Sequence, residues 1–267
     1  LLHWGLNRTR DLDNISAYDH VASQVARVGS DGISLDIESN AAKIPSQQAE
    51  LRVNLTLFTM RLRAALRRQN PAAVLIFCTT AYPDRPDSNK GGWPHFDLAA
   101  LAKATDWFFV MAYGTDEWRD NRTAIANSNI DLTRALIINY PRIGVPLTHL
   151  VLGLPWYGYD NTCTASTRPD ARVCVRGKSG RELGPAGAFF QELPLLYDLR
   201  HRDACDPPLR KCGPESFDRQ RHTILGLLTN RSSTVMYDEV SESPFFNYVE
   251  NGSTHQVWYD SPESLRR

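Results

Sequence analysis

The sequence predicts an α/β fold in which helices cover a parallel sheet. Through the first 160 residues, short apolar segments typical of buried strands alternate with longer segments whose apolar residues recur at helical spacing. Near-continuous apolar strands separated by amphipathic helices indicate a parallel sheet with helices on its faces. A doubly wound sheet and a closed (β/α) barrel both have this rhythm, and periodicity alone does not choose between them.

Amphipathic patterns predict four helices. The first starts at a capping box of Ser16 and Asp19 and stops at Gly29, with Val21, Val25 and Val28 on one face. The second runs from a cap at Ser46 to Pro71, which cannot continue a helix. Its apolar residues share one face: Leu51, Leu55, Phe58, Leu62 and Leu66. Two further helices are predicted over residues 98–103 and 125–140.

Four apolar segments predict the strands between these helices: DGISLDIE, AVLIFCTTAY, DWFFVMAYG and HLVLGLPWYG. In both candidate architectures, functional side chains gather at the carboxyl ends of parallel strands. Chemically useful side chains occupy those ends here: Asp36, Glu38, Met111, Tyr113, Trp156 and Tyr157. Each aromatic residue by itself is more often a packing residue, so only their joint position at strand ends favours a binding role.

Residues 160–255 break the rhythm and read as an insertion within a single domain over residues 1–267. The insertion is rich in Cys, Pro and Gly, contains one or two helices such as DRQRHTILGLLTN, and leads into the short strand HQVWYD. We expect two disulfides among four of its cysteines, although a zinc site is the competing interpretation: Cys163, Cys174, Cys205 and Cys212. Cys78, alone in an apolar run, is predicted to be a buried thiol.

Charge and hydropathy exclude several kinds of partner. Lys plus Arg and Asp plus Glu both number 30, so no net field favours nucleic acid or an anionic membrane. No segment approaches the roughly 18 consecutive apolar residues of a membrane-spanning helix. We therefore expect a neutral polymer, if the protein binds a polymer, and neither nucleic acid nor a membrane.

The first residues indicate a missing N-terminus, and the glycosylation motifs point to the secretory pathway. The sequence starts with neither an initiator Met nor the regions of a signal peptide, so we expect the true N-terminus to lie outside it. Six Asn-x-Ser/Thr motifs occur, against roughly two expected by chance, which favours glycosylation. The acceptor residues are Asn7, Asn14, Asn54, Asn121, Asn230 and Asn251.

The acidic strand DGISLDIE carries the strongest chemical signal. Strand alternation places Ser34, Asp36 and Glu38 on one face, opposite the apolar side chains. A desolvated carboxylate costs several kcal/mol unless it is paired or protonated, so two on one strand face indicate a function. Glycosidic bond cleavage needs a carboxylic acid beside a second group that meets the developing positive charge. A negative Asp36 would help to keep Glu38 protonated for this role.

Three of the strands resemble motifs of glycoside hydrolase family 18, in the same order and at similar spacing. DGISLDIE resembles its Asp-Gly-x-Asp-x-Asp-x-Glu strand, WFFVMAYG its Met-x-Tyr-Asp strand, and VLGLPWYGYD its Gly-x-Pro-x-Tyr-Gly strand. The segment SPFFNYVENGSTHQVWYDSPES and Cys163 are similar to the branch of lysosomal di-N-acetylchitobiases. The resemblance covers nearly the whole chain and is weakest over residues 178–215.

The resemblance implies a (β/α)8 TIM barrel that is incomplete in this sequence. Matched in order, strands 3 to 7 are present, strands 1, 2 and 8 are missing, and the insertion follows strand 7. An open partial barrel would expose apolar strand edges, so we expect the isolated chain to be unstable. A cooperative melt above about 50 °C would contradict this expectation.

The resemblance also implies a substrate-assisted mechanism, in which the 2-acetamido oxygen of the sugar attacks the anomeric carbon and water then opens the oxazolinium with retention. By position, Glu38 would be general acid and then base, and Asp36 would orient the acetamido N–H and stabilise the cation. Tyr113 would hydrogen-bond the acetamido oxygen, and Asp31 would hold the start of the strand. The other implied residues are Ser34 and Met111 in support, and Trp156, Tyr157, Trp258 and Asp116 in substrate binding.

Three departures from the family pattern bear on this assignment. Ser34 stands where most of the family has the middle Asp, which should leave the pKa of Glu38 less elevated. Gly114 replaces the Asp of Met-x-Tyr-Asp, where Asp116 or Glu117 could substitute through a shifted loop. The Trp that floors the family's sugar subsite belongs to the eighth strand.

The leading hypothesis is a retaining glycosidase, lysosomal or secreted, that cleaves N-acetylglucosamine-β-1,4-N-acetylglucosamine (GlcNAc-β-1,4-GlcNAc) without a metal or cofactor. A chitin- or glycan-binding lectin on the same barrel is the second hypothesis, supported by Gly114 and opposed by Glu38. The third is a divalent metal site in an unrelated barrel, in which Asp84 and Asp116 would have to join Asp36 and Glu38.

Overall fold

The computed structural model describes residues 15–37, 45–81, 83, 96–115, 123–155, 157–176, 193–194, 224, 227–228 and 233–266. The chain divides into two compact units. Unit 1 comprises residues 1–111 and 134–153, and unit 2 comprises residues 112–133 and 154–267. The predicted insertion falls within unit 2, and its place in a single domain stays a prediction.

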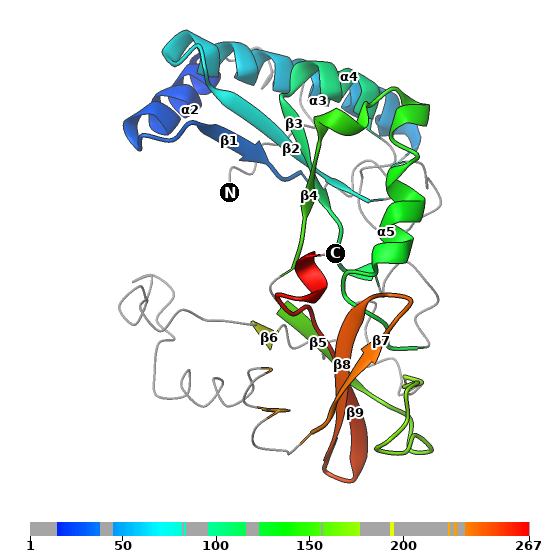
Figure 1. Ribbon diagram of the computed structural model, residues 1–267. Coiled ribbons are helices and arrows are strands. Elements are labelled where there is room, and N and C mark those ends of the chain that lie inside the picture. The colour runs from blue at the N-terminus through cyan, green and yellow to red at the C-terminus, as the bar shows by residue number, and fades with distance from the viewer. Residues whose placement is uncertain are drawn as a thin grey trace. The chain divides into compact units, whose positions relative to one another are not determined.

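Unit 1 contains the predicted parallel sheet. Its strands are β1 (Gly32–Leu35), β2 (Val74–Thr80), β3 (Trp107–Met111) and β4 (Leu150–Gly153), paired in that order and all parallel. Three helices, α2 (Ile15–Arg27), α3 (Pro45–Gln69) and α4 (Leu98–Ala104), lie on one side of this sheet in Figure 1. The sequence-based prediction of a parallel α/β layer is confirmed.

Helix boundaries follow local chemistry, which corrects two predicted caps. Helix α2 includes Ser16, so this residue does not cap it, and Asp19 forms an exposed ion pair with Arg68 of α3 instead of a capping box. Gly29 does end the helix, at a φ of 69° that suits glycine. Helix α3 starts at Pro45, one residue before the predicted cap, because a proline in the first turn lacks only an amide that would be unpaired there.

The helix predicted over residues 125–140 is shorter in the structure. Helix α5 covers Ile130–Ile137, and the Asn129 side chain accepts a hydrogen bond from the Leu132 amide at 3.0 Å. A capping side chain of this kind marks a helix start, so the residues before Asn129 cannot belong to the helix. After α5, a turn leads into the 3-10 helix Pro141–Ile143.

The core of unit 1 lies between the sheet and α3. All five apolar residues predicted to share one face of α3 are buried, with exposed fractions of 5% or less. From the sheet, Leu75, Phe77, Phe108 and Val110 are fully buried, and the rings of Phe77 and Phe108 lie 5.9 Å apart. On α2, Val21 is buried as expected, whereas Val28 is exposed because it follows the end of the helix. Burial of this apolar surface is the main stabilising contribution.

Unit 2 contains an antiparallel sheet that the sequence did not predict. Its strands are β5 (Tyr157–Thr162), β6 (Leu193–Pro194), β7 (Val235–Asp238), β8 (Ser243–Glu250) and β9 (Ser253–Trp258), in the order β6-β5-β9-β8-β7. Strand β9 confirms the strand expected at HQVWYD. Of the predicted helix DRQRHTILGLLTN, residues 224, 227 and 228 are described and are helical.

The strand predicted for HLVLGLPWYG is two strands in two sheets. Strand β4 ends at Gly153, and β5 begins at Tyr157 and pairs antiparallel with β9. Pro155 lies between them and has no amide for a sheet ladder, which accounts for the interruption.

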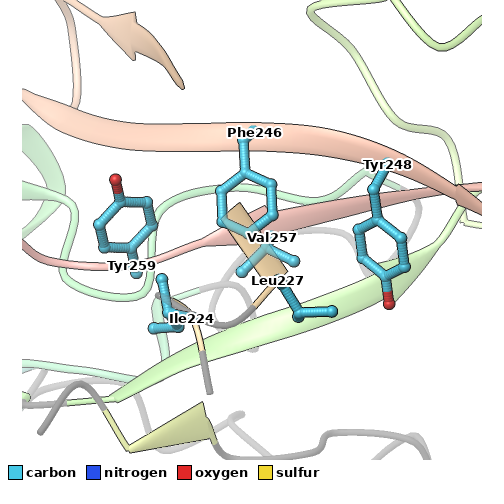
Figure 2. Close-up of a cluster of buried hydrophobic side chains, with 6 residues drawn as sticks. All are labelled: Ile224, Leu227, Phe246, Tyr248, Val257 and Tyr259. Atoms are coloured by element: carbon cyan, nitrogen blue, oxygen red, sulfur yellow. The ribbon is translucent and has the colours of Figure 1, made fainter. Parts of the chain in front are cut away.

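Buried aromatic and aliphatic residues form a hydrophobic cluster in unit 2 (Figure 2). Phe246 and Tyr248 come from β8, Val257 from β9, and Tyr259 directly follows β9. Ile224 and Leu227 complete the cluster and are at most 4% exposed. This cluster joins the segment of Ile224 and Leu227, which precedes β8 in the sequence, to the β8–β9 hairpin.

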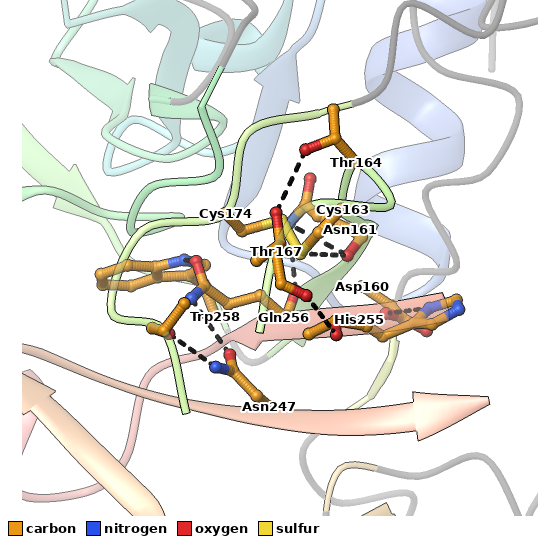
Figure 3. Close-up of a disulfide and its surroundings, with 12 residues drawn as sticks. Asp160, Asn161, Cys163, Thr164, Thr167, Cys174, Asn247, His255, Gln256 and Trp258 are labelled. Atoms are coloured by element: carbon orange, nitrogen blue, oxygen red, sulfur yellow. Dashed lines mark hydrogen bonds and ion pairs between the residues drawn. A yellow bond between two sulfur atoms is a disulfide. The ribbon is translucent and has the colours of Figure 1, made fainter. Parts of the chain in front are cut away.

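One predicted disulfide is present. Cys163 and Cys174 are bonded, with Cα atoms 5.2 Å apart (Figure 3), whereas Cys205 and Cys212 lie outside the described residues. Asn247 holds the same loop through hydrogen bonds from its side-chain amide to the carbonyls of Pro169 and Ala171. Cys78 is a buried thiol, as predicted.

Removing this disulfide should destabilise unit 2. A double substitution Cys163→Ser/Cys174→Ser is expected to lower the free energy of unfolding by about 2–3 kcal/mol, because the bond closes a short loop in the unfolded chain. Urea unfolding of both proteins measures the difference. Dithiothreitol should abolish that difference, and equal stability without reductant would contradict the prediction.

Candidate active site

The predicted site residues are only partly within the described part of the chain. Asp31, Ser34, Asp36, Met111, Tyr113 and Trp258 are described. Glu38, Asp116, Trp156 and the side chain of Tyr157 lie outside the described residues, as do Asp84 and Glu117. The assignments made for those residues stay predictions.

In unit 1, β1 has the predicted alternation of its two faces. Ser34 is exposed, Leu35 is 9% exposed, and Asp36, just after the strand, is again exposed. The Ser34 hydroxyl oxygen lies 3.2 Å from the Cys78 sulfur on the neighbouring strand. Ser34 and Asp36 therefore form a polar row on the face of β1 opposite the buried Leu35.

The start of β1 is held by its main chain. The amide of Val74 donates to the carbonyl of Asp31 at 2.9 Å, so Asp31 anchors the strand through its backbone. A Cβ atom added at Gly32 would lie 1.9 Å from the Val74 carbonyl oxygen. Gly32 therefore has a packing reason that is independent of chemistry, whereas the carbonyl at position 31 could come from any residue.

Asp36 is the titratable residue of this row that the structure describes. Part of its surface meets solvent, yet burial of the rest raises the pKa of its carboxyl above the ordinary value of 3.8. A raised pKa favours the neutral acid in the folded state. This carboxyl therefore contributes stability below pH of about 4 that is lost as the pH rises through its folded-state pKa.

The substitution Asp36→Asn should remove this pH dependence. At neutral pH, the variant is expected to unfold at a higher urea concentration than the wild type. This increase in the unfolding midpoint should be smaller at about pH 3, where the Asp36 carboxyl of the wild type is neutral in the folded and unfolded states. Asp31→Asn is the matched control, because it removes one exposed carboxylate from the same strand. An equal gain for Asp36→Asn at both pH values would contradict the prediction.

In unit 2, the segment that carries Tyr113 is hydrogen-bonded to Asn127. Tyr113 is partly buried, and Gly114 adopts a φ of 70°. The amide of Gly114 donates to the Asn127 side-chain oxygen at 2.9 Å, and the amide of Thr115 donates to the Asn127 carbonyl at 3.0 Å. Among the described residues, a Cβ added at Gly114 would meet only the Tyr159 hydroxyl oxygen, at 4.0 Å.

Trp258 does not offer a free ring face to a sugar. Its side chain is 5% exposed, and its ring stacks on Phe245 with centroids 4.4 Å apart. Its indole N–H donates to the side-chain oxygen of Gln256 at 2.8 Å (Figure 3). These contacts give Trp258 a packing role in unit 2, so we leave it out of the proposed binding site.

A second polar group in unit 2 was missed from the sequence. The hydroxyl of Tyr248 donates to Asp160 at 2.5 Å, and His255 Nδ1 lies 3.1 Å from the other carboxylate oxygen. The rings of Tyr248 and His255 stack with centroids 4.8 Å apart. These residues come from three strands that pair in the same sheet, and no spacing in the sequence joins them.

Neither a metal cluster nor a membrane span is found among the described residues. No three His, Cys, Asp or Glu side chains gather there as metal ligands. Because Glu38, Asp84 and Asp116 are outside that part of the chain, the metal hypothesis stays untested. No described helix is long and apolar enough to span a bilayer.

A match to a protein-family model shows which family the chain belongs to. The model for glycosyl hydrolases family 18 matches residues 13–267, which include the β1, β3 and β4–β5 segments with their motifs. The chain belongs to glycosyl hydrolases family 18. The resemblance that DGISLDIE, WFFVMAYG and VLGLPWYGYD indicated is therefore confirmed at the level of the family.

Curated relatives of this family 18 chain include animal di-N-acetylchitobiases. The Mus musculus protein is 26% identical over 88% of this chain, and the Homo sapiens protein is 25% identical over 88%. The matches cover 55% and 52% of those proteins. The chain thus spans about half the length of the curated relatives it matches.

Solved structures of chitinases have a similar fold. A chitinase from Chromobacterium violaceum superposes with a TM-score of 0.58 at 20% identity, covering 93% of this chain and 59% of that one. A class V chitinase from Nicotiana tobaccum gives a TM-score of 0.59 at 19% identity, covering 95% and 67%.

Proposed function

We propose that this family 18 chain carries the catalytic strand of a retaining glycosidase that cleaves GlcNAc-β-1,4-GlcNAc linkages. The observation that supports the proposal is the exposed polar row of Ser34 and Asp36 on β1, in a strand that matches the family motif and leads to Glu38. The names of the curated relatives favour a chitobiose unit as the substrate.

Each proposed role follows from the chemistry of the side chain. Glu38 protonates the leaving oxygen and then activates water, while the acetamido oxygen of the substrate forms the new bond to the anomeric carbon. Asp36 accepts the acetamido N–H and stabilises the positive ring with its negative charge. Tyr113 donates a hydrogen bond to the acetamido oxygen. The mechanism requires no metal or cofactor.

The parallel sheet of unit 1 supports the proposal of a (β/α)8 barrel. Its four strands pair in chain order, as barrel strands do, and helices lie on one side. On the opposite face, the register places Ser34 beside Ile76, and Ile76 beside Trp107. Trp107 is 43% exposed, although it lies on a strand. In the barrel we propose, this face is the interior.

We propose that the protein works in the lysosome or is secreted. The glycosylation motifs support this placement, and Asn251 is exposed in the turn between β8 and β9. Asn54 differs, since it lies on α3 with 4% exposure and donates to Glu50. A glycan at Asn54 is incompatible with the folded helix packing.

The alternative proposal is a glycan-binding lectin, and Gly114 is the observation that favours it. Gly114 supplies no side chain where the family motif has an Asp, so one charged group beside the reacting sugar is missing. A lectin would still bind the oligosaccharide through the remaining polar and aromatic groups.

Incubation with di-N-acetylchitobiose separates these proposals. Protein that shows a cooperative unfolding transition is mixed with the disaccharide, and released GlcNAc is measured by chromatography alongside binding by calorimetry. Product release with retained anomeric configuration is expected of the glycosidase. Binding without release would support the lectin and overturn the enzymatic proposal, and absence of both would contradict the two.

A further inference from the structure

The main chain that follows Tyr113 is hydrogen-bonded to a buried segment, residues 126–129. Asn127 is 1% exposed, and its side-chain oxygen accepts the hydrogen bond from the Gly114 amide at 2.9 Å. Its carbonyl accepts from the Thr115 amide at 3.0 Å and from the Thr115 hydroxyl at 3.1 Å. The Thr115 hydroxyl shares its single proton between this carbonyl and that of Ala126. Two consecutive residues after Tyr113 are therefore bound to the same asparagine.

The segment itself is tied to the C-terminal part of unit 2. Ser128, next to Asn127, donates to Asp260 at 2.7 Å. Ser264 donates to the other oxygen of the same carboxylate at 2.9 Å, and Asp260 is 1% exposed. The main chain after Tyr113 is thus connected, through buried hydrogen bonds, to Asp260 and Ser264 near the end of the sequence. A buried, fully bonded network of this kind holds one geometry.

The identity of residue 114 explains why the bond from Asn127 is needed. Asp and Asn side chains can hydrogen-bond nearby main-chain groups and so stabilise a turn locally. Gly114 has no such side chain, and its φ of 70° is a conformation that glycine adopts without strain but does not enforce. The main-chain conformation at Gly114 has to be fixed by another residue, and Asn127 supplies the acceptor for the Gly114 amide.

We propose that Asn127 is a positioning residue that holds the main chain after Tyr113 and thereby fixes the Tyr113 hydroxyl for the acetamido oxygen of the substrate. The role in turnover rests on the proposed function, whereas the clamp itself rests only on the hydrogen bonds of unit 2. Tyr113 contributes when the acetamido oxygen attacks, so loosening the clamp affects the reacting state more than substrate binding.

The clamp is tested without any activity measurement. In the substitution Asn127→Leu, the Gly114 amide loses its acceptor, and its hydrogen exchange, followed by NMR, should accelerate at least about tenfold. Asn127→Asp keeps the acceptor oxygen and should retain most of the protection. Asn129→Ala is the matched control, because Asn129 lies in the same segment and its side chain caps α5 without touching Gly114. Unchanged exchange in Asn127→Leu, or equal acceleration in Asn129→Ala, would overturn the clamp.

The role in catalysis is tested by a double-mutant cycle with Tyr113→Phe. Asn127→Leu should lower kcat for chitobiose about 10–100-fold with little change in KM, and Asn127→Asp should restore most of it. If Asn127 acts through Tyr113, the double variant is no slower than Tyr113→Phe alone, whereas Asn129→Ala and Tyr113→Phe combine additively. Additive losses for Asn127→Leu would overturn the positioning role. A wild type that releases no GlcNAc contradicts the proposed function and this role together, and leaves the exchange result to decide the clamp.

Discussion

Replacing Glu38 by Gln is expected to reduce hydrolysis of di-N-acetylchitobiose by about 10³-fold or more, because the amide can neither protonate the leaving oxygen nor activate water. The side chain keeps its size, so substrate binding and the unfolding midpoint should change little. Initial rates of GlcNAc release measure the effect, and calorimetry measures binding of the same disaccharide.

The substitution Glu50→Gln is the matched control for Glu38→Gln. Glu50 lies exposed on α3, and the same loss of one carboxylate there should leave the rate unchanged. If the Glu38→Gln variant kept full activity, Glu38 could not be the general acid. Equal losses in both variants would mean that the effect reflects charge or folding.

Replacing Gly32 by Ala is expected to lower the free energy of unfolding of unit 1 by about 3 kcal/mol, at the upper end of typical overpacking effects. The added Cβ would lie 1.9 Å from the Val74 carbonyl oxygen and 2.7 Å from its carbon, and both atoms belong to the paired strand β2. Neither can move without breaking the β1–β2 register. Urea unfolding followed by circular dichroism measures the loss.

Gly29 offers the control for this substitution. It lies three residues earlier with a φ of 69°, and an added Cβ there would meet nothing within 4 Å. Gly29→Ala should therefore lose only about 1 kcal/mol, from backbone strain in the left-handed region. Similar losses for the two substitutions would show that the contact with β2 is not what makes Gly32 necessary.

The parallel layer could be predicted because its signals are local. Five apolar residues at helical spacing predicted the buried face of α3. A short apolar run such as AVLIFC, flanked by predicted helices, predicted a buried strand. The polar row on β1 followed from strand alternation alone. The family motifs added the candidate catalytic residues that we propose, which periodicity does not supply.

Other features depend on contacts between distant residues. Nothing in HLVLGLPWYG shows that Tyr157 pairs in a different sheet from Val151, because the apolar pattern continues across Pro155. Trp258 looks like a sugar-stacking residue by type, and only its stacking on Phe245 reveals a core position. Asn127 sits in a polar run typical of a turn, and its bond to Gly114 spans 13 residues without any recognisable spacing.

Asn54 lies in a glycosylation motif and is buried in the folded protein, so packing of α3 and glycan attachment at Asn54 exclude each other. In the secretory location that we propose, the Asn54 motif would be open to glycan transfer only while α3 has not yet packed against the sheet. A chain modified at Asn54 could no longer bring that side chain to the interior, and the neighbouring Leu55 would lose its place with it. Maturation would then select molecules that folded this helix before the transferase reached it, and intact-mass measurement of secreted material should find Asn54 unmodified.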